Sequence, residues 1–487
     1  MLFNSFEFLL FFPVVTLLYF LLPHKFRWFL LLVASCFFYM FFKPIYILIL
    51  GFTIIIDYWA GIVIESATDE KKRKLFLIMS IVANLGVLAV FKYYNFLNDN
   101  ITGLAQIFNV KNPIPYLHIL LPIGLSFHTF QAMSYTIEVF RGNQKAERHF
   151  GIYALYVMFY PQLVAGPIER PQNMLHQFHE KHEFDYDNFV IGSRQILWGI
   201  FKKVVIADRL AIFITPILGS YERYSGFATV LAMVFFAFQI YCDFSGYSSI
   251  ALGTARIMGF KLMINFNRPY SSKSITEFWR RWHISLSTWF RDYLYIPLGG
   301  NRRGPFRRNF NVFLVFLLSG LWHGANWTFL VWGSLHGAAI LFESLTRNIK
   351  QQLFTRIPLF FSNFLFKTTT FIYVLIAWVF FRANSMKDSM NILHKMSGVF
   401  SELNRALHSK KYLHEYVLKA LSPKKIFFGF LLIIFLEIIH FIEKKDPIEI
   451  LLGRLSRPVR WSIYVVLFFI IFFCGAFQNR QFIYFQF

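Results

Sequence analysis

The sequence predicts an all-α polytopic membrane protein, and three features of its 487 residues carry the prediction. Hydrophobic residues make up 56% of the chain and charged residues 15%, whereas a soluble globular protein carries about 25% charged residues. Apolar runs of about 20 residues, long enough to cross a bilayer as helices, recur along the whole length. The alternating pattern of a membrane β-barrel does not occur. These features exclude a soluble enzyme, a disordered chain and a fibre.

The apolar runs follow one another from the first residues to the last. Since some of them are short enough to be re-entrant, we expect about 11–13 crossings. The candidate spans are residues 5–22, 26–42, 44–64, 75–97, 117–140, 149–165, 188–206, 226–244, 309–322, 326–346, 363–382, 426–442 and 461–477.

The charge of the chain is strongly basic, with 49 Lys and Arg against 26 Asp and Glu and a net charge of +23. The basic residues lie mainly between apolar runs, which favours loops beside anionic membrane lipid over a nucleic-acid partner. Basic clusters at 71–74, 299–309 and 444–460 predict cytoplasmic loops and place both termini outside the cytoplasm. The stretch 384–425 then lies outside although it carries eight Lys and Arg.

His323 is an ionisable residue that the sequence places inside the bilayer, past its midplane. It lies 15 residues after Arg308, about 22 Å away if the run is helical. Gly320 and Gly324 flank it, and a broken helix at that depth is tolerated where it lines an enclosed cavity. An imidazole there can take a proton from a hydroxyl, or it can join two helices by a hydrogen bond. We expect Trp322, Asn326 and Trp327 to shape the surrounding chamber.

Two more histidines lie near it in the sequence, and for both the sequence leaves structural and functional roles open. His283 follows a capping box at Ser274–Glu277, which predicts one helix that ends at Pro297 and carries an aromatic stripe. His336 is expected to hydrogen-bond a neighbouring helix.

Several other polar residues are predicted inside apolar segments. Asp243 precedes Ser245–Tyr247, where we expect a helix break, and it is a candidate for binding substrate or for a polar turn. His128 is expected to be a satisfied core histidine that faces the protein interior with Gln131 and Glu138. The sequence contains no metal-ligand spacing, no phosphate loop and no serine nucleophile elbow.

Five long motifs make the chain resemble the membrane-bound O-acyltransferase family, and they occur in the family's order. The resemblance is to the bacterial branch that includes the membrane proteins of alginate O-acetylation, peptidoglycan O-acetylation and lipoteichoic-acid D-alanylation. The motifs are FYPQLVAGPIERPQNMLHQF at 159–178, GIFKKVVIADRLA at 199–211, YCDFSGYSSIALGTARIMGF at 241–260, NFNRPYSSKSITEFWRRWHISLSTWFRDYLYIPLGGNR at 265–302 and LSGLWHGANWTFLVWGSLHG at 318–337.

The resemblance implies helices around a central tunnel, with family histidines at His323 and His283. It implies one membrane domain over 1–487, made of N-terminal helices over 1–118, a catalytic core over 119–346 and C-terminal helices over 347–487. It also implies a bacterial inner membrane and a polysaccharide acceptor. In the polysaccharide branch a separate periplasmic esterase-like partner usually makes the final transfer.

The resulting hypothesis is transfer of an acyl group, an acetyl group above others, from a cytoplasmic thioester such as acetyl-CoA, with no tightly bound cofactor. His323 acts as general base or acyl carrier, and His283 assists from the cytoplasmic side. The donor phosphates are expected to meet Arg302, Arg303, Arg307 and Arg308, although lipid contact would explain these residues equally well. Three alternatives remain: a transporter of an activated acyl group or lipid-linked sugar, a scaffold for a periplasmic transferase, and D-alanyl transfer to a teichoic-acid-type acceptor.

Overall fold

The computed structural model describes residues 1–119, 121–163, 166–346, 348–349, 352, 358–412, 422–477 and 482–483. All regular elements of these residues are helices, which confirms the predicted all-α fold. The chain divides into two compact units, one of Met1–Ile196 with Ile250–Ile264 and one of Leu197–Ser249 with Asn265–Phe487.

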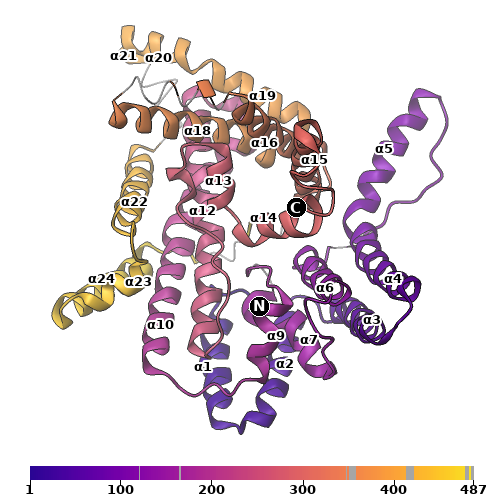
Figure 1. Cartoon of the computed structure of the whole chain (residues 1–487). Helices are drawn as coiled ribbons and strands as arrows, with labels where there is room; N and C mark the ends of the chain where they lie inside the picture. The colour runs from indigo at the N-terminus through magenta and orange to yellow at the C-terminus, as the bar shows by residue number, and fades with distance from the viewer. Residues whose placement is uncertain are drawn as a thin grey trace. The chain divides into compact units, whose positions relative to one another are not determined.

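The first unit holds the N-terminal helices. In it, α3 packs against both α4 and α6 (Figure 1). Asp57 of α3 lies fully buried at this packing and accepts hydrogen bonds from Ser80 and Asn84 of α4. The helices are α1 (Phe6–Leu21), α2 (His24–Met40), α3 (Ile47–Ser66), α4 (Glu70–Leu88), α5 (Tyr94–Ile107), α6 (Leu125–Phe140), α7 (Phe150–Met158), α8 (Tyr160–Leu163), α9 (Pro171–His179) and most of α10 (Tyr186–Ile200).

The second unit holds the family motifs from residue 197 onward and the C-terminal helices. Its elements are the π-helical segment η3 (Phe201–Ala207), α11 (Asp208–Gly219), α12 (Gly226–Ile257, whose last turns belong to the first unit), α13 (Ile275–Arg281), α14 (Ile284–Phe290), the π-helical segment η6 (Arg291–Tyr295), α15 (Gly304–His323), α16 (Trp327–Leu345), α18 (Leu359–Arg382), α19 (Met386–Ser397), α20 (Val399–His408), α21 (Lys410–Tyr412), α22 (Pro423–Ile442), α23 (Ile448–Leu451) and α24 (Arg457–Cys474).

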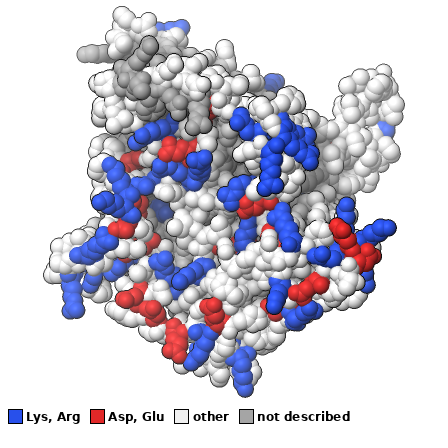
Figure 2. Space-filling model, viewed as in Figure 1, with Lys and Arg blue, Asp and Glu red and all other residues white. Residues whose placement is uncertain are grey.

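Each predicted span overlaps a helix, and the chain is a multi-pass membrane protein. Seven helical stretches of the described residues are both long and apolar enough to cross a membrane; the other predicted spans fall on shorter or more polar helices. The seven are Pro44–Ser66, Glu70–Ile107, Gly226–Ile257, Trp327–Leu345, Leu359–Arg382, Pro423–Ile442 and Arg457–Cys474. Figure 2 shows broad uncharged areas between the charged groups on the face drawn.

The predicted break at Ser245–Tyr247 is wrong, because α12 runs without interruption from Gly226 to Ile257. Gly246 lies against the backbone where α10 continues into η3, and a Cβ on it would come within 2.8 Å of the Gly199 carbonyl oxygen. The glycine therefore serves close contact between two helical segments rather than a turn.

Helices α15 and α16 pack against each other as a hairpin that carries several of the candidate residues (Figure 1). A Cβ on Gly320 would clash with the carbonyl of Phe329, so glycine is required where the helices meet. At one end of the hairpin Arg308 donates to Ser344 over 2.9 Å. At the other end Asn326 donates to the carbonyl of Asn384 over 3.0 Å. Residue 384 and the Arg-rich loop thus lie at opposite ends of helices that are nearly a membrane thickness long.

Candidate active site

His323 is the last residue of α15, and its side chain is only 4% exposed. The backbone turns extended at Gly324, where any Cβ would clash with the ring of Phe329. Asn326 then caps α16 by accepting from the Thr328 amide over 3.0 Å. The prediction for His323 assumed that the run from Arg308 to His323 is helical. The structure confirms this, because α15 begins at Gly304 and ends at His323.

Aromatic rings surround the imidazole of His323. The ring centres of Trp322 and Trp332 each lie 4.9 Å from it, and that of Phe381 lies 5.6 Å away. Trp332 also stacks on Trp378 at 5.9 Å. This packing keeps bulk water away from the histidine, which is 4% exposed.

His283 lies between α13 and α14 rather than inside one helix, so the predicted continuous helix from 274 to 297 is wrong. The capping box at Ser274 is present, but α13 ends at Arg281 and His283 takes a left-handed conformation with φ of 44°. This left-handed residue separates α13 from α14, and its imidazole is fully buried.

Asn265 fixes the proton on the His283 ring. The Asn265 side-chain oxygen accepts from the Ser285 amide at 3.2 Å and from the Ser285 hydroxyl at 3.0 Å, and it lies 3.2 Å from His283 Nδ1. Because that oxygen only accepts, Nδ1 carries the proton and Nε2 holds the lone pair. His283 does not belong to any of the seven membrane-spanning stretches named above. Its burial in the protein lowers the pKa of the imidazole to about 3, so the ring is neutral at physiological pH.

The fold brings the two histidines of the resemblance together. The ring centres of His283 and His323 lie 6.4 Å apart, and the indole of Trp322 lies 6.2 Å from His283 and 4.9 Å from His323. The two residues are 40 positions apart in the sequence. Both histidines lie where a helix is interrupted: His283 between α13 and α14, and His323 at the end of α15.

His336, on α16, does not make the expected hydrogen bond to a neighbouring helix. It is fully buried, and neither ring nitrogen has a hydrogen-bond partner among the residues that the structure describes. Its ring lies 5.0 Å from that of Trp332 and 5.1 Å from that of Trp279. Trp332 therefore stands between His323 and His336.

Asp243 lies in a buried ion-pair cluster. Its carboxylate is 2.7 Å from Lys203 Nζ, which is also 2.9 Å from Asp208. The second carboxylate oxygen accepts from the Ile483 amide over 2.8 Å. Sequence reasoning did not single out Lys203, although two adjacent lysines inside an apolar run were a signal for it.

The same contact connects the C-terminal residues to the candidate site. Phe482 is fully buried, and its ring lies 5.4 Å from that of Phe244. Phe244 in turn lies 4.7 Å from the His283 ring. Asp243 thus holds residues 482–483 where they support the wall behind His283.

The other predicted site residues differ in how far they are buried in the protein. Trp322 is buried against both histidines, whereas Trp327 begins α16 and is 55% exposed. The side chain of Asn326 accepts from the Thr328 amide at the start of α16 and donates to the Asn384 carbonyl. In the basic loop, Arg302 and Arg303 are exposed, Arg307 lies over the ring of Phe310 at 5.4 Å, and Arg308 binds Ser344.

A cavity of about 250 Å³ lies between the α13–α14 segment and α15. Its wall is apolar except for a few polar groups, including Arg280 and Arg291. It reaches Ser319, one helical turn before His323, and Trp279, which contacts His336. An apolar cavity with cations in its wall suits a ligand that combines an apolar part with an anionic head.

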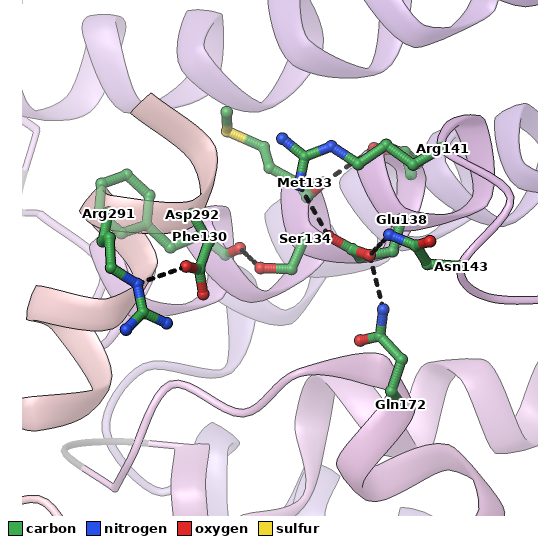
Figure 3. Close-up of polar contacts among 10 residues, drawn as sticks. Phe130, Met133, Ser134, Glu138, Arg141, Asn143, Gln172, Arg291 and Asp292 are labelled. Atoms are coloured by element: carbon green, nitrogen blue, oxygen red, sulfur yellow. Dashed lines mark hydrogen bonds and ion pairs between the residues drawn. The ribbon is translucent and has the colours of Figure 1, made fainter. Parts of the chain in front are cut away.

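Buried polar groups of the first unit are held by hydrogen bonds instead. His128, Gln131 and Glu138 of α6 are buried as expected, and His128 Nδ1 lies 3.2 Å from the Val157 carbonyl oxygen. In Figure 3, Glu138 accepts from Arg141, Asn143 and Gln172. His128 is therefore a core histidine as predicted, but only its Nδ1 is paired, because Nε2 has no hydrogen-bond partner in the described part of the chain.

Residues 114–386 match the membrane-bound O-acyltransferase family. The chain belongs to this family. The match contains His283, His323 and the cavity described above, and it makes the protein a membrane-bound acyltransferase.

Curated relatives cover most of the chain. A probable alginate O-acetylase of Pseudomonas aeruginosa is 42% identical over 83% of this chain and 77% of its own length. A peptidoglycan O-acetyltransferase of Helicobacter pylori is 36% identical over 76% of this chain and 73% of its own length. A teichoic acid D-alanyltransferase of Streptococcus thermophilus is 30% identical but covers only 45% of this chain.

Proposed function

We propose that the protein takes an acetyl group from a cytoplasmic thioester, acetyl-CoA, and delivers it across the inner membrane for O-acetylation of an extracytoplasmic polysaccharide. The relatives that match most of the chain carry the names of alginate and peptidoglycan O-acetyltransferases. The observation that carries the proposal is the pair of buried imidazoles 6.4 Å apart at the end of α15, beside an apolar cavity.

The donor approaches from the end of the α15–α16 hairpin that holds the basic loop. Arg302 and Arg303 are exposed there, and Arg280 and Arg291 lie in the cavity wall. Arginine binds phosphate through paired N–H donors, so these side chains suit the diphosphate of coenzyme A. The thioester arm then lies along the apolar cavity toward Ser319 and the end of α15.

His323 acts on the hydroxyl that receives the acyl group. Its imidazole takes the hydroxyl proton while the oxygen attacks the carbonyl carbon. The new C–O bond forms, the C–S bond breaks, and the departing thiolate takes the proton from the imidazolium. The aromatic wall keeps water away from this carbon.

His283 positions the reacting groups, and it does not take the hydroxyl proton that His323 accepts. Asn265 fixes its Nδ1 as a donor, which leaves the Nε2 lone pair as an acceptor beside the indole of Trp322. We assign it to orientation of the donor or of His323. Trp322 contacts both rings and fixes their separation.

The acceptor side of the proposal includes a partner. Since the chain carries no serine nucleophile elbow, a periplasmic esterase-like protein is expected to complete the transfer to the polysaccharide. Both termini of the membrane protein are proposed to be extracytoplasmic. Alginate-like exopolysaccharide and peptidoglycan are the two acceptors to distinguish.

Labelled acetyl-CoA tests the proposal. Membranes that contain the wild-type protein and its periplasmic partner should place label in ester linkage on exopolysaccharide or peptidoglycan, and each polymer is isolated and counted. His323→Gln should abolish the label, while His394→Gln, an exposed histidine of α19, should keep it. Equal labelling with folded His323→Gln would contradict the role of His323, and no label in either polymer with the wild type would contradict the proposed acceptors.

A further inference from the structure

A second cavity, of about 340 Å³, lies between α11 and α22 and is separate from the histidine site. Its volume is within the range of small-molecule sites. The lining consists of three cations, five apolar side chains and one glycine: Arg209, Leu210, Ile212, Phe213, Lys424, Lys425, Phe428, Gly429 and Leu432.

The apolar part of this groove lies on a membrane-spanning helix. α22 has 20 residues and a mean hydropathy of 2.3 over its most apolar stretch. Phe427, Leu431 and Ile434 next to the groove are exposed large hydrophobic residues. Such a face is in contact with lipid tails, so the groove between α11 and α22 is within reach of an acyl chain from the bilayer.

The charged side chains in the lining of the groove are all cations, and no acidic side chain lies among them. Lys424 and Lys425 are exposed and form no ion pair with any residue of the described ranges. Arg209 donates through Nε to the Cys474 carbonyl, which holds its guanidinium at this place. A ligand that complements the groove therefore combines an anionic head with an apolar tail.

The start of α22 gives a separate argument for an anion. Lys424 and Lys425 lie in the first turn of the helix, where the helix dipole disfavours positive charge. Ser422, the N-cap residue, makes no side-chain capping hydrogen bond. The amides of Lys425 and Ile426 already donate to the Ser422 carbonyl, so an anion here would serve chiefly to neutralise the two lysines. Such an anion would explain why lysines stand where acidic residues are usually preferred.

We propose that this groove binds an anionic phospholipid. Its phosphate contacts Lys424, Lys425 and Arg209, and one acyl chain lies along Leu210, Phe213, Phe428 and Leu432. The lipid would join α11 to α22 at a place where the two helices leave a gap. The proposal does not depend on the acyl-transfer chemistry, because none of the lining residues contacts His283 or His323.

Native mass spectrometry of the purified protein, saturated with equal amounts of phosphatidylglycerol and phosphatidylcholine, tests the site. The wild type should retain phosphatidylglycerol. Lys424→Gln with Lys425→Gln should retain on the order of 20–30-fold less, since each lysine contributes about a fivefold preference for anionic lipid. Lys444→Gln with Lys445→Gln, a second lysine pair just beyond the other end of α22, is the matched control and should behave as the wild type.

Two further measurements separate the possible ligands. Ile212→Trp fills the groove without removing charge, and it should also reduce retained phosphatidylglycerol. Added inorganic phosphate should not displace the lipid, because phosphate lacks the tail. Equal retention of phosphatidylcholine, full displacement by phosphate, or unchanged retention in Ile212→Trp or in the Lys424/Lys425 variant would each overturn the proposal. Size-exclusion profiles identical to the wild type establish that the variants are folded.

Discussion

Three buried histidines of the second unit have surroundings that differ from those of Asp57 and His128 in the first unit. In the first unit, Asp57 is enclosed by hydrogen-bond donors on the adjacent helix α4, and His128 binds a backbone carbonyl. In the second unit, the rings of His283, His323 and His336 are enclosed largely by aromatic side chains. Hydrogen bonds between helices fix a fold, whereas an aromatic wall creates a dry space around an imidazole.

The difference gives a way to recognise chemistry in a membrane protein. Polar residues at membrane depth are functional candidates by default. Asp57 and His128 satisfy that rule by position alone, yet their partners show that they join helices. His323 combines its predicted depth with an aromatic wall, a second imidazole and an adjacent cavity.

The largest expected effect compares His323 with His128. His323→Gln should lower the rate of acyl transfer about 10²–10⁴-fold, because it removes the proposed proton acceptor. His128→Gln should keep the rate per folded molecule, since glutamine can still bond the Val157 carbonyl. The measurement is labelled acetyl transfer in detergent-solubilised protein of verified fold. If both variants lost the same factor in transfer rate, the proposed distinction between a catalytic His323 and a structural His128 would be wrong.

A smaller loss is expected when the orientation of His283 is disturbed. Asn265→Ala removes the acceptor for His283 Nδ1 and for Ser285, and kcat should fall about tenfold while KM for the donor stays constant. Asn265→Asp keeps an acceptor at the same place and should restore part of kcat. A change in KM alone would assign Asn265 to donor binding instead.

A weaker effect on rate is expected at Asp243, which acts through the C-terminal residues. Asp243→Ala breaks the bond to the Ile483 amide and leaves Lys203 with Asp208 alone. We expect a loss of about 1–3 kcal/mol in the free energy of unfolding and a rate reduction smaller than that of Asn265→Ala. Thermal unfolding and transfer assays measure the two. A loss of rate as large as that of His323→Gln, with normal stability, would show that Asp243 contacts substrate.

The smallest effect on rate is expected at Asp57. Asp57→Ala removes the carboxylate that accepts from Ser80 and Asn84, while Thr136 and the Ser80 carbonyl remain as their partners. The change should cost about 1 kcal/mol of stability and nothing in transfer rate per folded molecule. Double substitution with Ser80→Ala should cost less than the sum of the single changes, because both remove one network. If Asp57→Ala lowered the transfer rate without lowering the stability, Asp57 would have a role in the reaction itself.

Much of the fold could be predicted because the bilayer imposes a simple pattern on the sequence. Apolar runs of a fixed length predicted helices that the structure contains, and the segment around Arg308 and His323 is helical as assumed. The errors occurred where backbone conformation depends on tertiary contacts. Gly246 indicated a break but serves helix packing, and the helix predicted through His283 is interrupted by a left-handed residue.

The sequence by itself determined the fold class, the membrane setting, the family motifs and the two histidines, since hydropathy and local motifs are properties of neighbouring residues. Only the tertiary structure decided that His283 meets His323, that Asn265 sets its proton, and that Phe482 lies behind it. These contacts join residues 18 to more than 200 positions apart. Their geometry follows from packing of whole helices, which no local pattern in the chain encodes.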